Sequence, residues 1–105
     1  MSGILQGTTP TLTIKIPEEI PVSGIRGIEL TLKQGDTVTL LHRSDLIVDT
    51  EANTISRLFS EEETLALNPS QPLFWQLRIE TADGIFGTPK GRITVFDLIS
   101  TEALT

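Results

Sequence analysis

The chain has 105 residues, the common size of one domain, and 38% of them are apolar, which is enough to bury a core and too many for a disordered chain. Its net charge of −6, with eight scattered Lys and Arg residues, excludes the basic stripe that is typical of nucleic-acid binders. The absence of cysteine excludes disulfides and thiolate metal sites.

Residues 1–5 lack the basic start and the long apolar run of a signal peptide, so we expect synthesis without a leader. No apolar stretch approaches the ~18 residues that a membrane helix needs, and we expect no membrane insertion.

Alternation of apolar and polar residues is the dominant signal along the chain. Successive side chains of a β-strand point to opposite faces, so alternation predicts strands with one buried and one solvated face. It also favours antiparallel sheets, because parallel sheets have continuous apolar runs. In chain order, the alternating segments run from Leu12 to Ile16, from Ile28 to Leu32, from Trp75 to Ile79 and from Ile93 to Val95.

Turn residues separate these segments. Gln-Gly-Asp at 34–36 lies between expected strands at 28–33 and 37–42, which predicts a hairpin. Ala-Asp-Gly at 82–84 predicts a second hairpin, with Asp-Gly as its turn. Thr-Pro-Lys-Gly at 88–91 has Pro and Gly at the positions of a type I turn, and it predicts a jog in the last strand.

One short helical turn is expected near residues 60–67. Ser60 and Glu63 have the spacing of a capping box, in which each side chain accepts a hydrogen bond from the backbone amide of the other residue. The acidic residues at 61–63 also favour the positive end of a helix dipole. We expect this turn to carry the chain from one sheet to the other.

About seven short strands, with turn signals roughly every ten residues, predict an all-β fold, an immunoglobulin-like antiparallel β-sandwich that spans 1–105 as one domain. A closed barrel is the alternative. The cysteine pair of an antibody-type domain is absent, although Trp75 could fill the core in a similar way. Unless a bulge intervenes, Arg57 falls in the inward phase of the strand that holds Ile55 and Phe59, and we expect its long side chain to snorkel outward at the edge of the sandwich.

The residues that could support chemistry do not form a constellation. His42 is interpreted as a half-exposed strand residue rather than a general base or ligand. The three carboxylates at 61–63 diverge by ~100° each on a helix. Asp45 and Asp49 lie near a turn but outside any calcium-loop motif. We therefore predict no catalysis, no cofactor and no metal.

Three phenylalanines are candidates for an interface. Phe74 points away from the face of Trp75, so Phe74, Phe86 and Phe96 are expected to form an exposed apolar patch or, alternatively, to fill a core.

Two strands are the expected sheet edges, where another chain can pair with the backbone. One is the segment at 9–16, which Pro10 and Pro17 flank and which adds Thr11 and Thr13 to the candidate interface residues. The other is the jogged final strand.

Several segments resemble a family of small phage and prophage proteins from Gram-positive hosts. Leu-Gln-Gly-Thr-Thr-Pro-Thr at 5–11 is similar to the family's N-terminal Arg-Gly-Thr-Thr-Pro-Thr signature. The further similar segments are Asn-Thr-Ile-Ser at 53–56, Phe-Ser-Glu-Glu-Glu-Thr-Leu at 59–65, Gln-Leu-Arg-Ile at 76–79, Ala-Asp-Gly at 82–84 and Ile-Thr-Val-Phe-Asp-Leu-Ile at 93–99. Gln6 departs from the family's usual Arg, and Arg57 from its usual apolar residue.

Members of that family look like the N-terminal β-sandwich module of phage baseplate upper proteins. The resemblance implies a structural protein of the tail or baseplate, located in the virion or in the host cytoplasm during assembly. Its implied partners are other phage structural proteins or a second copy of the chain. The alternative function is a stand-alone module that binds glycan or peptide in a bacterial surface system.

Overall fold

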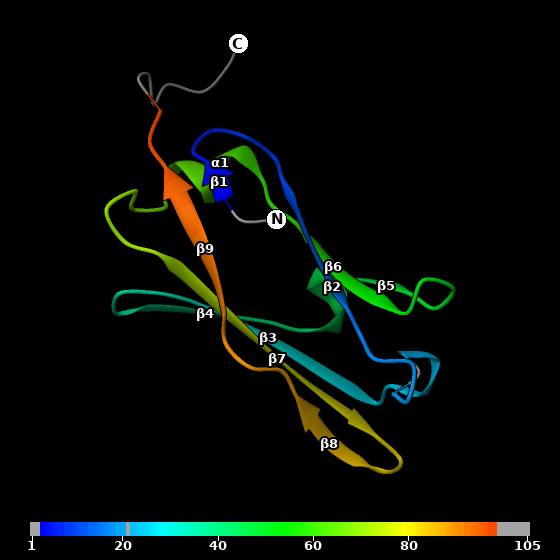
Figure 1. The fold of residues 1–105 in the computed structure, drawn as a ribbon. Helices are drawn as coiled ribbons and strands as arrows, with labels where there is room; N and C mark the ends of the chain where they lie inside the picture. Colours follow the sequence, from blue (N-terminus) through cyan, green and yellow to red (C-terminus); the bar gives the residue numbers. More distant parts are fainter. Residues whose placement is uncertain (1–2, 21, 99–105) are drawn as a thin grey trace.

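The computed structural model describes residues 3–20 and 22–98, and these residues form two β-sheets that pack face to face (Figure 1). The strands among them are β1 (Gly3–Leu5), β2 (Thr11–Lys15), β3 (Gly27–Gln34), β4 (Thr37–Leu41), β5 (Ile47–Asp49), β6 (Thr54–Leu58), β7 (Leu73–Thr81), β8 (Gly84–Gly87) and β9 (Gly91–Phe96). The helical elements are the 3-10 turns η1 (Val22–Gly24) and η2 (Arg43–Asp45) and the helix α1 (Glu61–Leu65).

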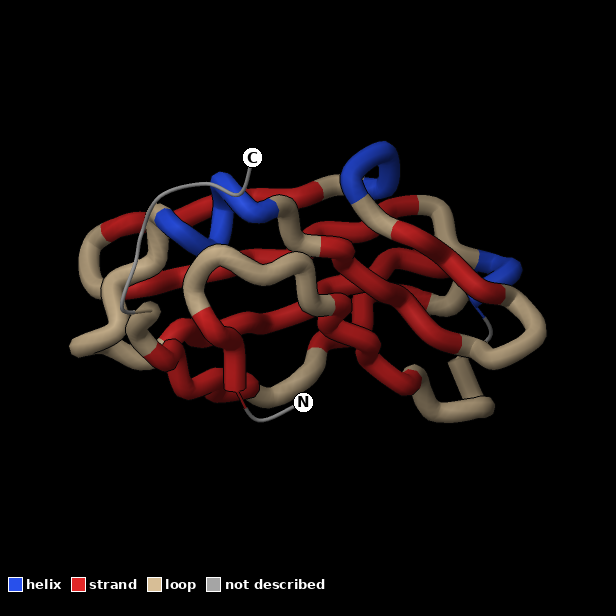
Figure 2. Tube along the Cα trace, turned by 90° about the horizontal axis from the view of Figure 1, so that it is seen from above, coloured by secondary structure: helices blue, strands red, loops and turns tan. Residues whose placement is uncertain are grey.

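The larger sheet has the strand order β1-β9-β7-β3-β4, with β8 paired to β7, and the smaller sheet has the order β2-β6-β5. All pairs are antiparallel except β1 with β9. In an immunoglobulin domain, strands C, F and G form one sheet, and strands B, E and D lie in the other. Here β3, β7 and β9 correspond to C, F and G, and β2, β6 and β5 correspond to B, E and D. The predicted immunoglobulin-like sandwich is confirmed, and Figure 2 shows its layers from above.

Two differences explain why about seven strands were expected and nine are found among the described residues. The three-residue strand β1 is too short to show alternation, and its pairing with β9 is long-range. The jog at 88–90 splits the last strand into β8 and β9, as predicted, but those residues form no turn, so the type I turn is wrong. The second hairpin turns at Ala82-Asp83, and Gly84 already pairs with Thr81.

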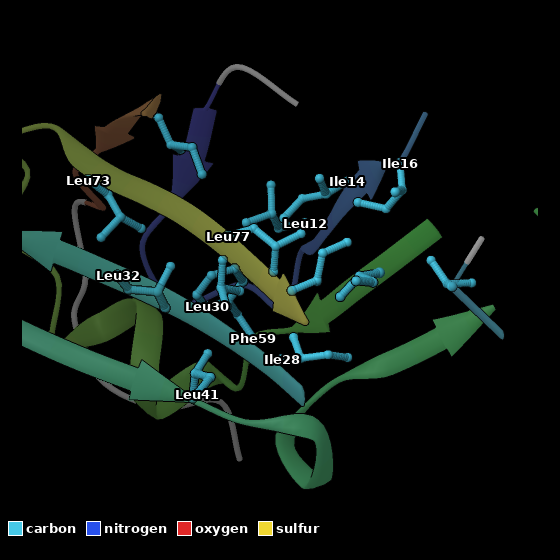
Figure 3. Packing of buried hydrophobic residues seen from close by; sticks show 14 of the residues in the cluster. Leu12, Ile14, Ile16, Ile28, Leu30, Leu32, Leu41, Phe59, Leu73 and Leu77 are labelled. Atoms are coloured by element: carbon cyan, nitrogen blue, oxygen red, sulfur yellow. The ribbon is translucent and has the colours of Figure 1, made fainter. Parts of the chain in front are cut away.

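The core lies between the sheets and contains the alternating residues that the sequence predicts (Figure 3). Leu12 and Ile14 of β2 face Leu77 of β7, and each is at most 5% exposed. Leu41 is buried whereas Leu40 is exposed, so the Leu-Leu pair follows ordinary alternation. Trp75 also faces inward and packs against this core, but it lies at the margin and is only partly buried.

Helix α1 connects β6 of the smaller sheet to β7 of the larger one, as predicted. Its capping box is present: the Glu63 amide donates to the Ser60 hydroxyl at 3.1 Å, and the Ser60 amide donates to the Glu63 carboxylate at 2.9 Å. Leu12 pairs with Arg57, which places Arg57 on the inward face without a bulge. The predicted inward phase of Arg57 is therefore confirmed. Its guanidinium binds Glu63 at 2.7 Å, and with 19% of its side chain exposed it does not extend freely into solvent.

The segment at 5–10, which carries much of the family resemblance, passes the chain from the larger sheet to the smaller one. Gln6 is 6% exposed, and its amide donates to the Leu67 carbonyl at 2.7 Å and accepts from the Leu98 amide at 3.2 Å. Thr64, which is fully buried, donates to the Thr8 carbonyl at 2.8 Å. Gln6 thus ties the chain just after β1 to the segments that follow α1 and β9.

Candidate functional site

Strand β2 is an edge of the smaller sheet, as the sequence predicts. In an immunoglobulin domain strand A lies in the sheet of B, E and D. Here the first strand, β1, pairs with β9 in the other sheet, and within the part of the chain that the structure describes only β6 pairs with β2. The predicted edge at the final strand is wrong for β9, which lies between β1 and β7.

The register of β2 on β6 defines which backbone groups face this edge. The Ile16 amide donates to the Asn53 carbonyl, and the Phe59 amide donates to the Pro10 carbonyl, both at 2.9 Å. Because hydrogen-bonded positions alternate along an antiparallel pair, the even-numbered residues of β2 bond to β6. The N–H and C=O groups of Thr11, Thr13 and Lys15 therefore point to the open edge.

Beside this edge lies an apolar groove of about 360 Å³ between the two sheets. Ile14 and Ile16 form one wall, and Phe86 and Pro89 of the β8–β9 region form the other. Trp75 and Leu77 are among the residues that line it between these walls. The groove exists because no described strand continues the smaller sheet past β2, so the gap between the sheets opens to solvent on this side.

Asn53 holds the rim of the groove in place. Its side-chain amide donates to the carbonyls of Ile16 at 2.9 Å and Pro17 at 3.1 Å, and its oxygen accepts from the Val22 amide at 2.9 Å. Its φ of 54° is in the left-handed region, which Asn tolerates better than most residues. These hydrogen bonds therefore fix the wall next to β2.

The structure separates the three predicted phenylalanines. Phe86 pairs with Ile79, faces inward and lines the groove. Phe74 and Phe96 lie on the outer face of the larger sheet, where Phe96 is 55% exposed and Phe74 is partly buried. Phe74 pairs with Arg92, which shares the outward phase of β9 with Phe96. Because Phe86 is on the inner face, the three rings do not form one patch.

Phe74 has a basic neighbourhood. Lys33 and Arg92 are its cross-strand partners on β3 and β9, and the Lys90 ammonium lies 5.1 Å from the centre of its ring. This distance is within the range of a cation–π contact. The contact covers part of the ring, which explains why Phe74 is not fully exposed.

The candidates for chemistry lie apart from the groove. His42 is exposed and follows β4 rather than lying in it. Asp49 accepts hydrogen bonds from the Glu51 and Ala52 amides, both at 3.0 Å, and so stabilises a turn. Asp45 accepts from the His42 amide at 3.1 Å. Among residues 3–20 and 22–98, no three His, Asp or Glu side chains are grouped closely enough to hold a metal ion.

The surroundings of Glu63 shift its pKa. Burial raises the pKa, but the hydrogen bond from the Ser60 amide and the Arg57 guanidinium together lower it by more, so the pKa of Glu63 lies below its ordinary value. The Arg57–Glu63 pair is thus an ionised structural contact at the junction of β6 and α1.

In comparisons with known proteins, no family model matches the sequence and no curated protein matches it significantly.

No helix in the described part of the chain has the length and apolar character needed to cross a membrane.

Of the candidate interface residues, the structure places Thr11 and Thr13 at the open edge and Phe86 in the groove, but the sequence did not indicate the groove as a unit. Trp75 and Pro89 were interpreted only as a core residue and a turn residue, although both line the groove. The alternating pattern of β2 shows which residues face inward, but only the placement of two sheets shows that part of the inner face is uncovered.

Proposed function

We propose that this chain is a structural protein of a phage or prophage particle, a component of the tail or baseplate that acts through protein–protein contacts. The resemblance of the segments at 5–11, 59–65 and 93–99 supports the phage assignment. The open edge of β2 beside an apolar groove supports protein contact as the mode of action, because unpaired strand edges and apolar grooves are both common sites of association.

The observation that carries the protein–protein part of the proposal is the coincidence of two features at one place. Thr11, Thr13 and Lys15 present unpaired backbone groups, and the apolar groove opens beside them. The proposal includes no catalytic step.

Mass spectrometry of particles purified after prophage induction of the source strain tests the phage assignment. We expect the chain in the particle fraction at a fixed ratio to tail proteins. Its absence from purified particles, together with neighbouring genes unrelated to tail fibre, holin or endolysin, would overturn the assignment.

A glycan or peptide module remains the alternative, and Trp75, which lines the groove, is the residue that would contact a sugar ring. A glycan array separates the two functions. Saturable glycan binding that Trp75→Ala abolishes would favour the alternative, whereas an array without hits would count against glycan binding.

A further inference from the structure

We propose that the groove receives an extended strand of a partner protein, which pairs with β2 and inserts apolar side chains at alternate positions between the two sheets. This inference rests on the proposed function only in that the partner is another protein.

The backbone of β2 defines the register of this strand. Three alternate residues of β2 each offer one N–H donor and one C=O acceptor at the open edge: Thr11, Thr13 and Lys15. The next edge position is Pro17, which has no N–H, so the ladder ends there. A partner strand that bonds to these three residues extends the smaller sheet by one strand.

The groove defines the side chains of the partner strand. Every second residue of an added strand points toward the larger sheet. There it meets the apolar lining formed by Trp75, Leu77 and Phe86. The partner strand therefore needs apolar side chains at alternate positions and polar ones between them, as in other strand-addition complexes, where the pockets give specificity and the backbone gives affinity.

The open edge and the apolar groove, taken together, argue against a second copy of β2 as the occupant. Thr13 of two copies could pair in an antiparallel manner, which would satisfy the edge. However, Leu12 and Ile14 of the second copy are 4% and 5% exposed within their own core, so they cannot also fill the groove of the first copy. A segment that is not already part of a folded sheet satisfies both requirements.

Charge gives a preference for one end of the strand. Glu18 and Glu19 are exposed just past Pro17, and the chain has a net charge of −6. A basic residue at the end of the partner strand that lies beside Pro17 is therefore favoured, and an acidic one there is disfavoured.

The sole tryptophan of the chain lines the groove and reports on its occupancy. The probe is the synthetic peptide Lys-Thr-Val-Thr-Val-Thr-Val-Lys, and its control is Lys-Val-Val-Val-Thr-Thr-Thr-Lys, which has the same composition without alternation. We expect a saturable blue shift of the Trp75 emission with the first peptide only.

Two variants at the edge separate backbone pairing from side-chain contact. Thr13→Pro removes a donor that faces the open edge and not β6, so the fold is retained. We expect it to weaken binding of the alternating peptide about tenfold, whereas Thr13→Ala, which keeps the donor, binds as wild type does.

A second pair of variants tests the groove. Phe86→Ser should weaken binding of the alternating peptide. Ile85→Ser, at a neighbouring side chain that is 65% exposed, should not.

Equal binding of both peptides, or of Thr13→Pro and Thr13→Ala, would overturn the inference even if Phe86→Ser proved unstable. Because the chain has no cysteine, Thr13→Cys provides a test for the other occupant. A disulfide dimer that forms through this residue under mild oxidation would assign the edge to a second copy. If these tests fail but the protein is found in particles, the proposal of a strand partner is wrong and the proposed function still stands.

Discussion

The Arg57 guanidinium binds the Glu63 carboxylate at 2.7 Å and donates to the Asp45 carbonyl at 3.0 Å, so one inward-facing side chain joins β6, α1 and the end of η2. The Nε atom of Arg57 is buried without a partner. The side chain of Arg57 is 19% exposed and that of Glu63 is 35% exposed. Because Arg57 is the more buried of the two, it relies more than Glu63 does on this ion pair to compensate its charge.

Glu63→Gln keeps a capping-box side chain but removes the charge that balances Arg57. We expect the free energy of unfolding to fall by about 1 kcal/mol, a value that allows for the partial exposure of Glu63. Arg57→Met should cost less, because an apolar side chain suits the inward face and Glu63 keeps its bonds to Ser60. Urea denaturation measures both variants, and a larger loss for Arg57→Met would contradict this ranking.

The Glu63 carboxylate also predicts how stability changes with pH. Its pKa is lower in the folded protein than in the unfolded chain, so the unfolded chain binds the proton more tightly. The stabilisation is complete above the unfolded value of about 4.3 and is lost as the pH falls through the folded value. The difference in unfolding free energy between wild type and Glu63→Gln should therefore shrink as the pH is lowered from 7 toward 3. A difference that stays constant or grows over this range would contradict the assignment.

Local patterns predicted much of this fold. The inward residues of β2, β3 and β7 and the cap at Ser60 depend on near neighbours in the chain, and the structure confirms them. The pairing of β1 with β9 could not be predicted, because it joins residues about ninety positions apart and β1 is too short to show alternation. The ion pair of Arg57 could not be predicted for a similar reason: its partner Glu63 lies in the next element, beyond the strand pattern.

The candidate site shows the same division. Pro10 and Pro17 indicated an edge at β2, and that edge is present. The groove is assembled from three separate segments, at 14–20, 75–79 and 86–89, and their meeting follows from the way the two sheets pack. No local pattern in any one of these segments contains that information.

Gly91 provides a test of the placement of Trp75. A Cβ atom at Gly91 would lie 2.0 Å from Cε2 of the indole ring, far inside van der Waals contact. Gly91→Ala should therefore displace the ring, lower the stability by about 1–3 kcal/mol and shift the tryptophan emission. Gly24→Ala is the control, because nothing lies within 4 Å of its added Cβ atom. Equal stability of the two variants would contradict the position of Trp75.

Phe74 and Phe96 lie on the outer face of the larger sheet, so their replacement should spare the core. We expect Phe74→Ser and Phe96→Ser to remain folded by circular dichroism, with Phe96→Ser losing less than about 1 kcal/mol of stability because its ring is 55% exposed. Leu77→Ser, at a side chain that is 1% exposed, should lose about 3 kcal/mol or more. Unfolding of Phe96→Ser would place that ring in the core instead.

The central claim is that the edge of β2 is open and available to a partner, and amide hydrogen exchange measured residue by residue by NMR tests it most directly. In the free protein we expect alternating protection, with slow exchange at Leu12 and Ile14, which bond to β6, and fast exchange at Thr11, Thr13 and Lys15. Addition of the alternating peptide should slow these three amides. Slow exchange at Thr11, Thr13 and Lys15 in the free monomer would show that the edge is already covered, and it would contradict the account.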